Sequence, residues 1–327
     1  MKKIIFLLVA SILALAILPA CGKKNKNTIR LNEVTHSVFY APLYLAIEDG
    51  YFEEYGYKIK LTNGGGADKS MTALISGSAD IALMGPESAI YTYLGGKKDY
   101  PKVFGQLTKK DGSFLVSRKA EPNFKWSDLQ GKEIIAGRKG GVPAMTLEYV
   151  LKNNGLVDGQ NVTLNYDVQF SMTASAFING VGDYVTVFEP TASEMQKNGQ
   201  GYIVASVGQG SGEVPYTSFI TTQSYLKNNG DMVENFLKAI KKAYDFIYTH
   251  TEIEVAQKIV KQFPSTTVET LAVSIKSYKD IDAWVNDLIM SEQSFERLQD
   301  IMQGAGELEK RVDYDKLVDN TFALKLK

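Results

Sequence analysis

The sequence predicts an α/β fold divided into two lobes, and three observations support this prediction. Stretches typical of β-strands alternate with stretches typical of helices between residues 28 and 210, a pattern that indicates parallel sheets with helices on their faces. The chain has 327 residues, which is more than one hydrophobic core usually supports. Its hydrophobic fraction of 44% is sufficient for packed cores in both lobes.

The first part of the chain contains three strand-then-helix units. The expected strands span residues 28–34, 57–63 and 79–85. The expected helices span residues 40–50 and 67–77, and a third begins at Pro86. Glycines end the first two helices, where their tolerance of positive φ suits a helix C-terminus.

The second part of the chain repeats this pattern and then becomes helical. The expected strands span residues 132–137 and 183–188, and the helices that follow them span residues 142–155 and 189–199. Beyond about residue 225, apolar residues recur with helical spacing, as in residues 231–250. We expect this tail to serve mainly as structural cover.

Four prolines mark the turns from strand to helix. Pro42, Pro86, Pro143 and Pro190 each stand at the start of an expected helix, where the missing N–H of proline is harmless. The prolines therefore locate the turns without proving a ligand. In open α/β sheets, however, ligands bind beyond the carboxyl ends of the strands, beside helix N-termini that present free N–H groups. We expect the binding site where these turns converge.

The converging turns carry aromatic, charged and glycine residues that suit a small-molecule cleft. The candidate ligand-binding residues are His36, Phe39, Tyr40, Gly65, Gly66, Gly85, Glu87, Ser88, Arg138, Gly140, Gly141, Val142, Phe188 and Glu189. The sequence shows no Ser–His–Asp order, P-loop or His-x-x-x-His spacing. We therefore assign no catalytic residue, cofactor or metal ligand and expect a binding protein.

The single cysteine, Cys21, follows a stretch with the features of an export signal. Lysines at positions 2 and 3 precede the uncharged apolar run 4–18, which is shorter than the roughly 20 residues of a membrane-spanning helix. The letters "LPAC" that end at Cys21 resemble a bacterial lipobox. We expect removal of residues 1–20 and lipid attachment to Cys21; the alternative is an ordinary signal peptide with an incidental cysteine.

The segment that follows Cys21 indicates a tether, and the overall charge and the few cysteines and histidines exclude several kinds of partner and site. Residues 21–27 are polar and predict a flexible tether between lipid and fold. The net charge is −1 and becomes −3 when the signal is removed with its two lysines. Nucleic-acid binding normally demands a basic face, so no nucleic-acid partner is expected. One cysteine and two histidines are too few for a disulfide or a typical structural zinc site.

Several stretches resemble the substrate-binding proteins of ABC importers in the nitrate/sulfonate/taurine and thiamine-pyrimidine group. They are "HSVFYAPLYLAIEDGYFEEYG", "GGGADKSMTALISGSADIALMGPESAIY", "GRKGGVPAMTLEYVLKNNGL" and "GDYVTVFEPTASEMQ". The resemblance covers nearly all of residues 28–325. It implies a two-lobed periplasmic-binding-protein fold of the class II type, with lobe 1 formed by residues 28–115 and 216–327 and lobe 2 by residues 116–215. The lobes are expected to close around the ligand by hinge motion.

The resemblance also implies partners and a location. A monomer is expected on the extracytoplasmic face of the cell membrane, held by its lipid anchor, binding a small molecule and delivering it to an ABC permease with its ATPase subunits. Two other classes are open. Fungal relatives in the thiamine-pyrimidine group are enzymes that use their own histidine and an iron bound near a cysteine-rich segment. This chain has no cysteine-rich segment. A sensory ligand-binding subunit would differ in partner but not in pocket.

The ligand itself is the open question of the sequence. Arg138 and Lys139 could hold an aliphatic sulfonate, taurine or nitrate. Glu87 and Glu189 disfavour such an anion, because a carboxylate that faces an anion costs binding energy. A carboxylate that faces amino or ring N–H groups instead gains a charge-assisted hydrogen bond. The aromatic residues that follow the first strand suit stacking on a flat ring. The balance favours a nitrogen heterocycle such as a thiamine-pyrimidine precursor.

Overall fold

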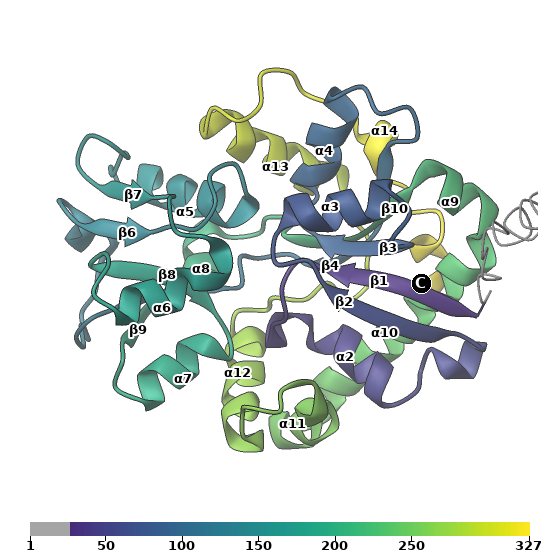
Figure 1. Ribbon diagram of the computed structural model, residues 1–327, viewed down its shortest axis with the longest axis horizontal. Coiled ribbons are helices and arrows are strands. Elements are labelled where there is room, and N and C mark those ends of the chain that lie inside the picture. The colour runs from purple at the N-terminus through teal and green to yellow at the C-terminus, as the bar shows by residue number, and fades with distance from the viewer. Residues whose placement is uncertain (1–26) are drawn as a thin grey trace, which may run out of the picture.

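The computed structural model describes residues 27–327 and contains two five-stranded sheets (Figure 1). The predicted signal peptide and the lipid attachment at Cys21 lie outside the described residues. Within residues 27–327, no helix combines the length and apolar character needed to cross a membrane.

The first sheet has the strand order β2-β1-β3-β10-β4. Its strands are β1 (Thr28–Glu33), β2 (Lys58–Asn63), β3 (Ile81–Met84), β4 (Pro101–Thr108) and β10 (Thr217–Thr222). Strands β2 and β3 both pair with β1 in parallel, whereas β10 runs antiparallel to β3 and β4. The three parallel strands therefore end at the same edge, as the alternating pattern predicts.

The second sheet has the order β7-β6-β8-β5-β9. Its strands are β5 (Ser113–Ser117), β6 (Glu133–Ile135), β7 (Thr163–Asn165), β8 (Tyr184–Phe188) and β9 (Tyr202–Ser206). Strand β6 is parallel to β7 and β8, and β5 runs antiparallel to β8 and β9. Because β5 belongs to this sheet, the first crossing between lobes lies before Ser113, slightly earlier than the expected boundary after residue 115.

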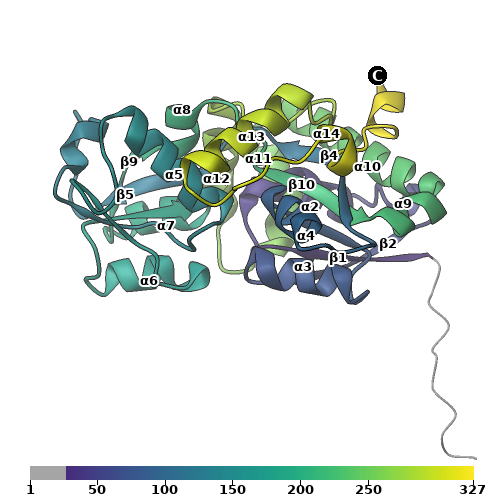
Figure 2. The same cartoon turned by 90° about the horizontal axis from the view of Figure 1, so that it is seen from above.

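Helices cover both sheets and connect the strands (Figures 1 and 2). Those of the strand–helix units are α2 (Ala41–Glu48), α3 (Ala67–Ile75), α4 (Glu87–Leu94), α5 (Val142–Asn153), α6 (Thr173–Ile178), α7 (Thr191–Lys197) and α8 (Val207–Ser211). Those of the tail are α9 (Gln223–Asn228), α10 (Gly230–Thr249), α11 (Glu252–Ile259), α12 (Val268–Asp280), α13 (Glu292–Gly304) and α14 (Tyr314–Leu317).

The four prolines lie where the sequence predicts, at helix starts. Pro42 and Pro143 fall in the first turns of α2 and α5. Pro86 and Pro190 directly precede α4 and α7 as their N-cap residues. All four thus stand at strand-to-helix turns, and these turns face the other lobe in Figure 1.

The helical tail is more than a cover on one lobe. Helix α12 packs against α7 of the second lobe and against the short helix η1 (Val38–Tyr40) of the first. Helix α13 contacts α5 of the second lobe and α4 of the first, and Figure 2 shows it above both lobes. The tail therefore bridges the two lobes on two sides.

An aromatic cluster fills the junction between the lobes. The Phe39 ring is fully buried, and its centroid lies 4.9 Å from that of Tyr278 in α12 and 5.7 Å from that of Tyr216. The Trp284 indole donates a hydrogen bond of 2.8 Å to the Phe39 carbonyl. Burial of one such aromatic ring contributes about 1.5–3 kcal/mol, so this cluster holds the crossing segments together.

Candidate functional site

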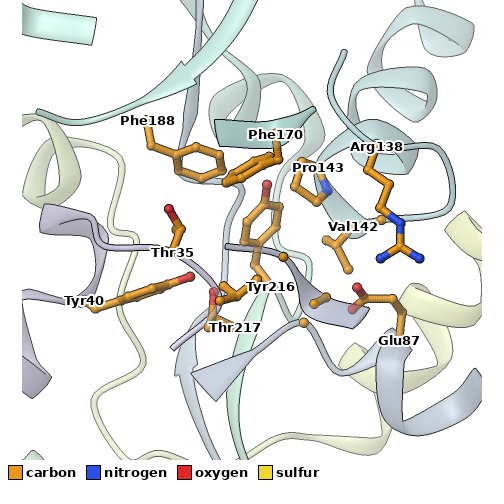
Figure 3. Close-up of a pocket in the computed structure, with 15 residues that line it drawn as sticks. Thr35, Tyr40, Glu87, Arg138, Val142, Pro143, Phe170, Phe188, Tyr216 and Thr217 are labelled. Carbon is orange, nitrogen blue, oxygen red and sulfur yellow. The ribbon is translucent and has the colours of Figure 1, made fainter. Parts of the chain in front are cut away.

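An enclosed cavity of about 70 Å³ lies between the two sheets, where the strand-to-helix turns converge (Figure 3). The first lobe and the crossing segments contribute Val34, Thr35, Tyr40, Gly66, Ala67, Gly85, Glu87, Tyr216 and Thr217. The second lobe contributes Arg138, Gly141, Val142, Pro143, Phe170 and Phe188. The lining is mostly apolar with a few polar groups, which is typical of small-molecule sites.

Aromatic rings form much of the wall. Figure 3 shows Phe170 and Phe188 together on one side and Tyr40 at the end opposite Glu87. The Phe188 ring lies 5.8 Å from that of Phe170 and 6.2 Å from that of Tyr216. Flat rings at such separations can stack on a planar ligand.

Glu87 supplies the carboxyl group of this lining, and that group is buried. It lies in the first turn of α4, its residue is 3% exposed, and it points into the cavity region in Figure 3. Burial raises the pKa of Glu87 to about 7, although its own amide, the Val142 amide and the Arg138 charge favour the ionised form. Within residues 27–327, its Oε2 atom accepts no hydrogen bond.

Gly85 makes room for this carboxyl group. A Cβ atom at position 85 would lie 2.0 Å from Oε2 of Glu87, a distance that requires one of the two to move. The absence of a side chain at Gly85 therefore allows the carboxyl group to fold over the turn that follows β3.

A second buried acid lies behind the wall of the cavity. Asp111, in the first crossing segment, is fully buried, and its Oδ1 accepts hydrogen bonds of 2.6 Å from both the amide and the hydroxyl of Ser113. Burial raises the pKa of Asp111 to about 7. Its nearest titratable neighbour is the hydroxyl of Tyr216 in the second crossing segment.

Three contacts between the lobes close the cleft beside the cavity. The Arg138 guanidinium is 3.0 Å from the carboxylate of Asp68 at the start of α3. The Tyr91 hydroxyl in α4 donates a hydrogen bond of 2.9 Å to the Gly140 carbonyl. The Val142 amide of the second lobe lies beside the Glu87 carboxyl group of the first. The described arrangement is thus a closed one.

Eight of the candidate residues line the cavity together. They are Tyr40, Gly66, Gly85, Glu87, Arg138, Gly141, Val142 and Phe188. Three more lie next to them along the chain without lining it: Gly65, Ser88 and Gly140. Gly140 takes part in closure through its carbonyl rather than by contact with the cavity.

Two aromatic candidates from the first turn have other surroundings. Phe39 belongs to the buried cluster between the lobes. His36 lies 2.7 Å from Glu33 through Nδ1 and 2.9 Å from the Gln262 carbonyl through Nε2. Burial lowers the pKa of His36, but the Glu33 carboxylate raises it, and the net shift is upward. Neither side chain lines the enclosed cavity.

Glu189 does not face the enclosed cavity as the sequence suggests. Its carboxylate accepts hydrogen bonds from the amide and hydroxyl of Ser193, at 3.0 and 2.8 Å, and from the Ser274 hydroxyl at 3.4 Å. Its carbonyl accepts a hydrogen bond of 2.6 Å from Ser37 across the lobes. The carboxylate binds the first turn of α7 through Ser193, and the carbonyl connects the lobes.

Seven residues of the lining are absent from the sequence-based candidates. They are Val34, Thr35, Ala67, Pro143, Phe170, Tyr216 and Thr217. Most of these adjoin a candidate along the chain or the expected crossing at residue 216. The predicted turns therefore indicated the neighbourhood of these residues, although not the residues themselves. Phe170 lies in the short helix η4 (Phe170–Met172), outside every motif, and no sequence signal would have found it.

The fold and the cavity define a two-lobed α/β protein with a closed cleft for a small molecule. The chain belongs to the family described as NMT1/THI5 like, whose pattern matches residues 38–254. It is 42% identical over 322 residues to a Bacillus subtilis protein named "Putative binding protein YtlA", with 98% of this chain and 96% of that protein covered.

Solved structures share the architecture. The alkanesulfonate-binding protein SsuA of Xanthomonas axonopodis, bound to MOPS, is 20% identical with a TM-score of 0.72, covering 90% of this chain and 98% of that one. The nitrate-binding protein NrtA of Synechocystis is 16% identical with a TM-score of 0.74, covering 91% and 88%. The predicted two-lobed α/β fold of the periplasmic-binding-protein type is confirmed.

Proposed function

We propose that this protein is the extracytoplasmic solute-binding subunit of an ABC importer. The family, the binding-protein name of the B. subtilis relative and the closed cleft support this role. In this role the lobes close on a small solute and the closed complex delivers it to a permease with its ATPase subunits. The protein acts as a monomeric carrier without catalysis, so purified protein returns its ligand unchanged.

The proposed ligand is a nitrogen-bearing aromatic ring, such as an aminopyrimidine. One observation carries this proposal: the buried Oε2 atom of Glu87 has no hydrogen-bond donor among residues 27–327. Glu87 lines the cavity, whose wall is largely aromatic. A buried polar atom without a partner is costly. An amino or ring N–H group of a ligand would supply the missing donor, and the aromatic walls would cover the faces of the ring.

A small oxyanion, such as a sulfonate, taurine or nitrate, is the second candidate. The Arg138 side chain favours it, because its guanidinium borders the cavity. The same guanidinium is already paired with Asp68 at 3.0 Å, and the nearby Glu87 carboxyl would repel an anion whenever it is ionised. These two groups make the oxyanion the weaker candidate.

The ligand can be identified by mass spectrometry of protein purified without denaturation from its native host. We expect a small heterocycle with an exocyclic amino group or ring N–H. Recovery of a sulfonate or nitrate would contradict the proposed ligand, but it would leave the carrier role intact. Chemical turnover of the recovered compound by the pure protein would contradict the carrier role itself.

Membrane attachment through a lipid on Cys21 completes the proposal. It rests on the lipobox-like "LPAC" and the polar segment that follows it. We expect Cys21→Ala to release the exported protein from salt-washed membranes, as measured by fractionation. A mutant that stays fully in the membrane fraction would show that another segment holds it.

A further inference from the structure

A second cavity adjoins the enclosed one. It measures about 240 Å³ and shares three lining residues with the first: Thr35, Phe170 and Phe188. Figure 3 shows the Phe170 and Phe188 rings at the side of the enclosed cavity, and both residues also line the second one. The second cavity is also interlobar, since Asn63 ends β2 of the first lobe and Thr173 begins α6 of the second.

Hydroxyl and amide groups dominate the lining of this second cavity. They belong to Thr35, Ser37, Asn63, Ser171, Thr173, Thr186 and Thr191. Such side chains both donate and accept hydrogen bonds. Ser37, Thr173 and Thr186 already donate to backbone carbonyls, and Asn63 Oδ1 accepts from the Gly65 amide. The hydroxyls of Thr35, Ser171 and Thr191 are left for a ligand, and they match its hydroxyl groups better than an apolar group, which would leave them without partners.

The second cavity offers no unpaired charge among the described residues that line it. Its two ionisable side chains are His36 and Glu189. Both nitrogens of His36 are taken, by Glu33 and by the Gln262 carbonyl. The Glu189 carboxylate is held by Ser193 and Ser274. A phosphate or carboxylate placed here would meet no cation free to balance its charge, so a neutral group fits better.

The size of the enclosed cavity limits what it can hold. A cavity needs roughly 10–15 Å³ of this kind of volume for one water molecule, so about 70 Å³ accommodates about five to seven positions of that size. That is the size of a single six-membered ring. Any large substituent on the ring must therefore lie outside, and the shared wall of Phe170 and Phe188 leads to the second cavity.

We infer that the second cavity binds a neutral, hydroxyl-bearing substituent of the ligand, so that the natural ligand is an N-bearing aromatic ring with a polyol or sugar-like group. This inference rests on the proposed function, since it takes the ring in the enclosed cavity as given. The substituent passes the edge of the contacting Phe170 and Phe188 rings, whose centroids are 5.8 Å apart, and is bound by the hydroxyls of Ser171 and Thr191.

Calorimetry with three probes tests this inference on the whole protein, purified without its lipid and stripped of bound ligand. The probes are cytosine, cytidine and cytidine 5′-monophosphate, which present the same ring alone, with a neutral sugar and with a charged one. We expect cytidine to bind at least tenfold more tightly than cytosine. We expect the monophosphate to bind at least tenfold more weakly than cytidine.

Variants locate the effect in the second cavity. The double variant Ser171→Ala/Thr191→Val removes two hydroxyls with little change of shape, and we expect it to weaken cytidine binding about threefold to tenfold per lost hydrogen bond. It should leave cytosine binding unchanged. The matched control is Thr163→Val on strand β7, which lines neither cavity and should change neither affinity.

The possible failures are distinguishable. If cytosine binds and cytidine binds no more tightly, the second cavity does not hold the substituent, while the ring site stands. The same conclusion follows if the double variant weakens both probes equally. If neither pyrimidine binds, the ligand class under the proposed function and this inference are both wrong, and taurine binding in the same assay would identify the oxyanion site instead.

Discussion

Glu87 and Glu189 occupy matching places in the two lobes and have opposite environments. Glu87 follows β3 and begins α4, and Glu189 follows β8 and precedes α7; each stands beside a proline. Both are nearly fully buried, at 3% and 1% exposure. The Ser193 amide and hydroxyl both donate to the Glu189 carboxylate. The Glu87 carboxyl group has one long contact, 3.5 Å from the Ser88 hydroxyl to Oε1, and its Oε2 has no donor among residues 27–327.

This difference separates a structural carboxylate from a binding one. Burying an oxygen such as Oε2 without a hydrogen bond costs free energy, and burial raises the pKa of Glu87 to about 7. A protein that folds around such a group gains from it only when another molecule completes its hydrogen bonds. The satisfied Glu189 instead stabilises the junction between the lobes.

The largest expected effect is on ligand binding by Glu87→Gln. A hydrogen bond to a charged group contributes about 1.5–3 kcal/mol, so the affinity for an N–H-bearing ligand should fall about tenfold to 150-fold. Calorimetry at pH 8 measures the change. Glu189→Gln is the matched control, and with cytosine, which does not reach the second cavity that Glu189 lines, its affinity should stay within about threefold of the wild type. Equal losses in both variants would remove the distinction between the two glutamates.

The next effect is on stability, in the variant Glu189→Ala. This change leaves the amide and the hydroxyl of Ser193 without their acceptor, and we expect a loss of about 1–3 kcal/mol in the free energy of unfolding. Denaturant titration of the ligand-free protein measures it. A variant with wild-type stability and reduced ligand affinity would instead place Glu189 in the binding site.

A smaller effect is expected from Tyr91→Phe, which removes a hydrogen bond made between the lobes. The Tyr91 hydroxyl donates to the Gly140 carbonyl, and one such bond contributes about 0.5–1.5 kcal/mol. If the bond forms only on closure, ligand affinity should fall about twofold to tenfold while the stability of the ligand-free protein changes little. Tyr202→Phe, an exposed tyrosine at the start of β9, serves as control. An unchanged affinity would mean that this contact does not contribute to closure.

The strand–helix alternation allowed the fold and the position of the cavity between the two sheets to be predicted. The spacing of apolar residues and the residues of turns are signals that a short stretch of sequence contains. All four prolines accordingly fall at helix starts that face the cleft. Residues directly on these turns, such as Tyr40, Gly85 and Arg138, therefore line the cavity as expected.

Side-chain direction could not be predicted in the same way. Glu87 and Glu189 carry the same local signal, but their side chains point to different surroundings. The serines at 193 and 274 contact the Glu189 carboxylate, and the absence of a side chain at Gly85 makes room for that of Glu87. Phe170 reaches the cavity from a segment without periodic pattern. Such long-range packing has no marker within a short stretch of sequence.

The pH dependence of ligand affinity tests the central role of Glu87 most directly. Its pKa of about 7 in the closed arrangement without ligand lies above the usual 4.5, and a donor on the ligand would lower it in the complex. Binding then releases a proton below pH 7, so affinity should rise up to tenfold per pH unit from pH 5.5 to 7 and level off above.

Calorimetry from pH 5.5 to 8.5 on the wild type and on Glu87→Gln makes this measurement. The variant retains Asp111, with a pKa of about 7, and His36, with a raised pKa, so the difference between the two profiles isolates Glu87. The account predicts a rising wild-type profile and a flatter one in the variant. A wild-type affinity that rises as pH falls would contradict it, because an oxyanion binds best when the Glu87 carboxyl is neutral.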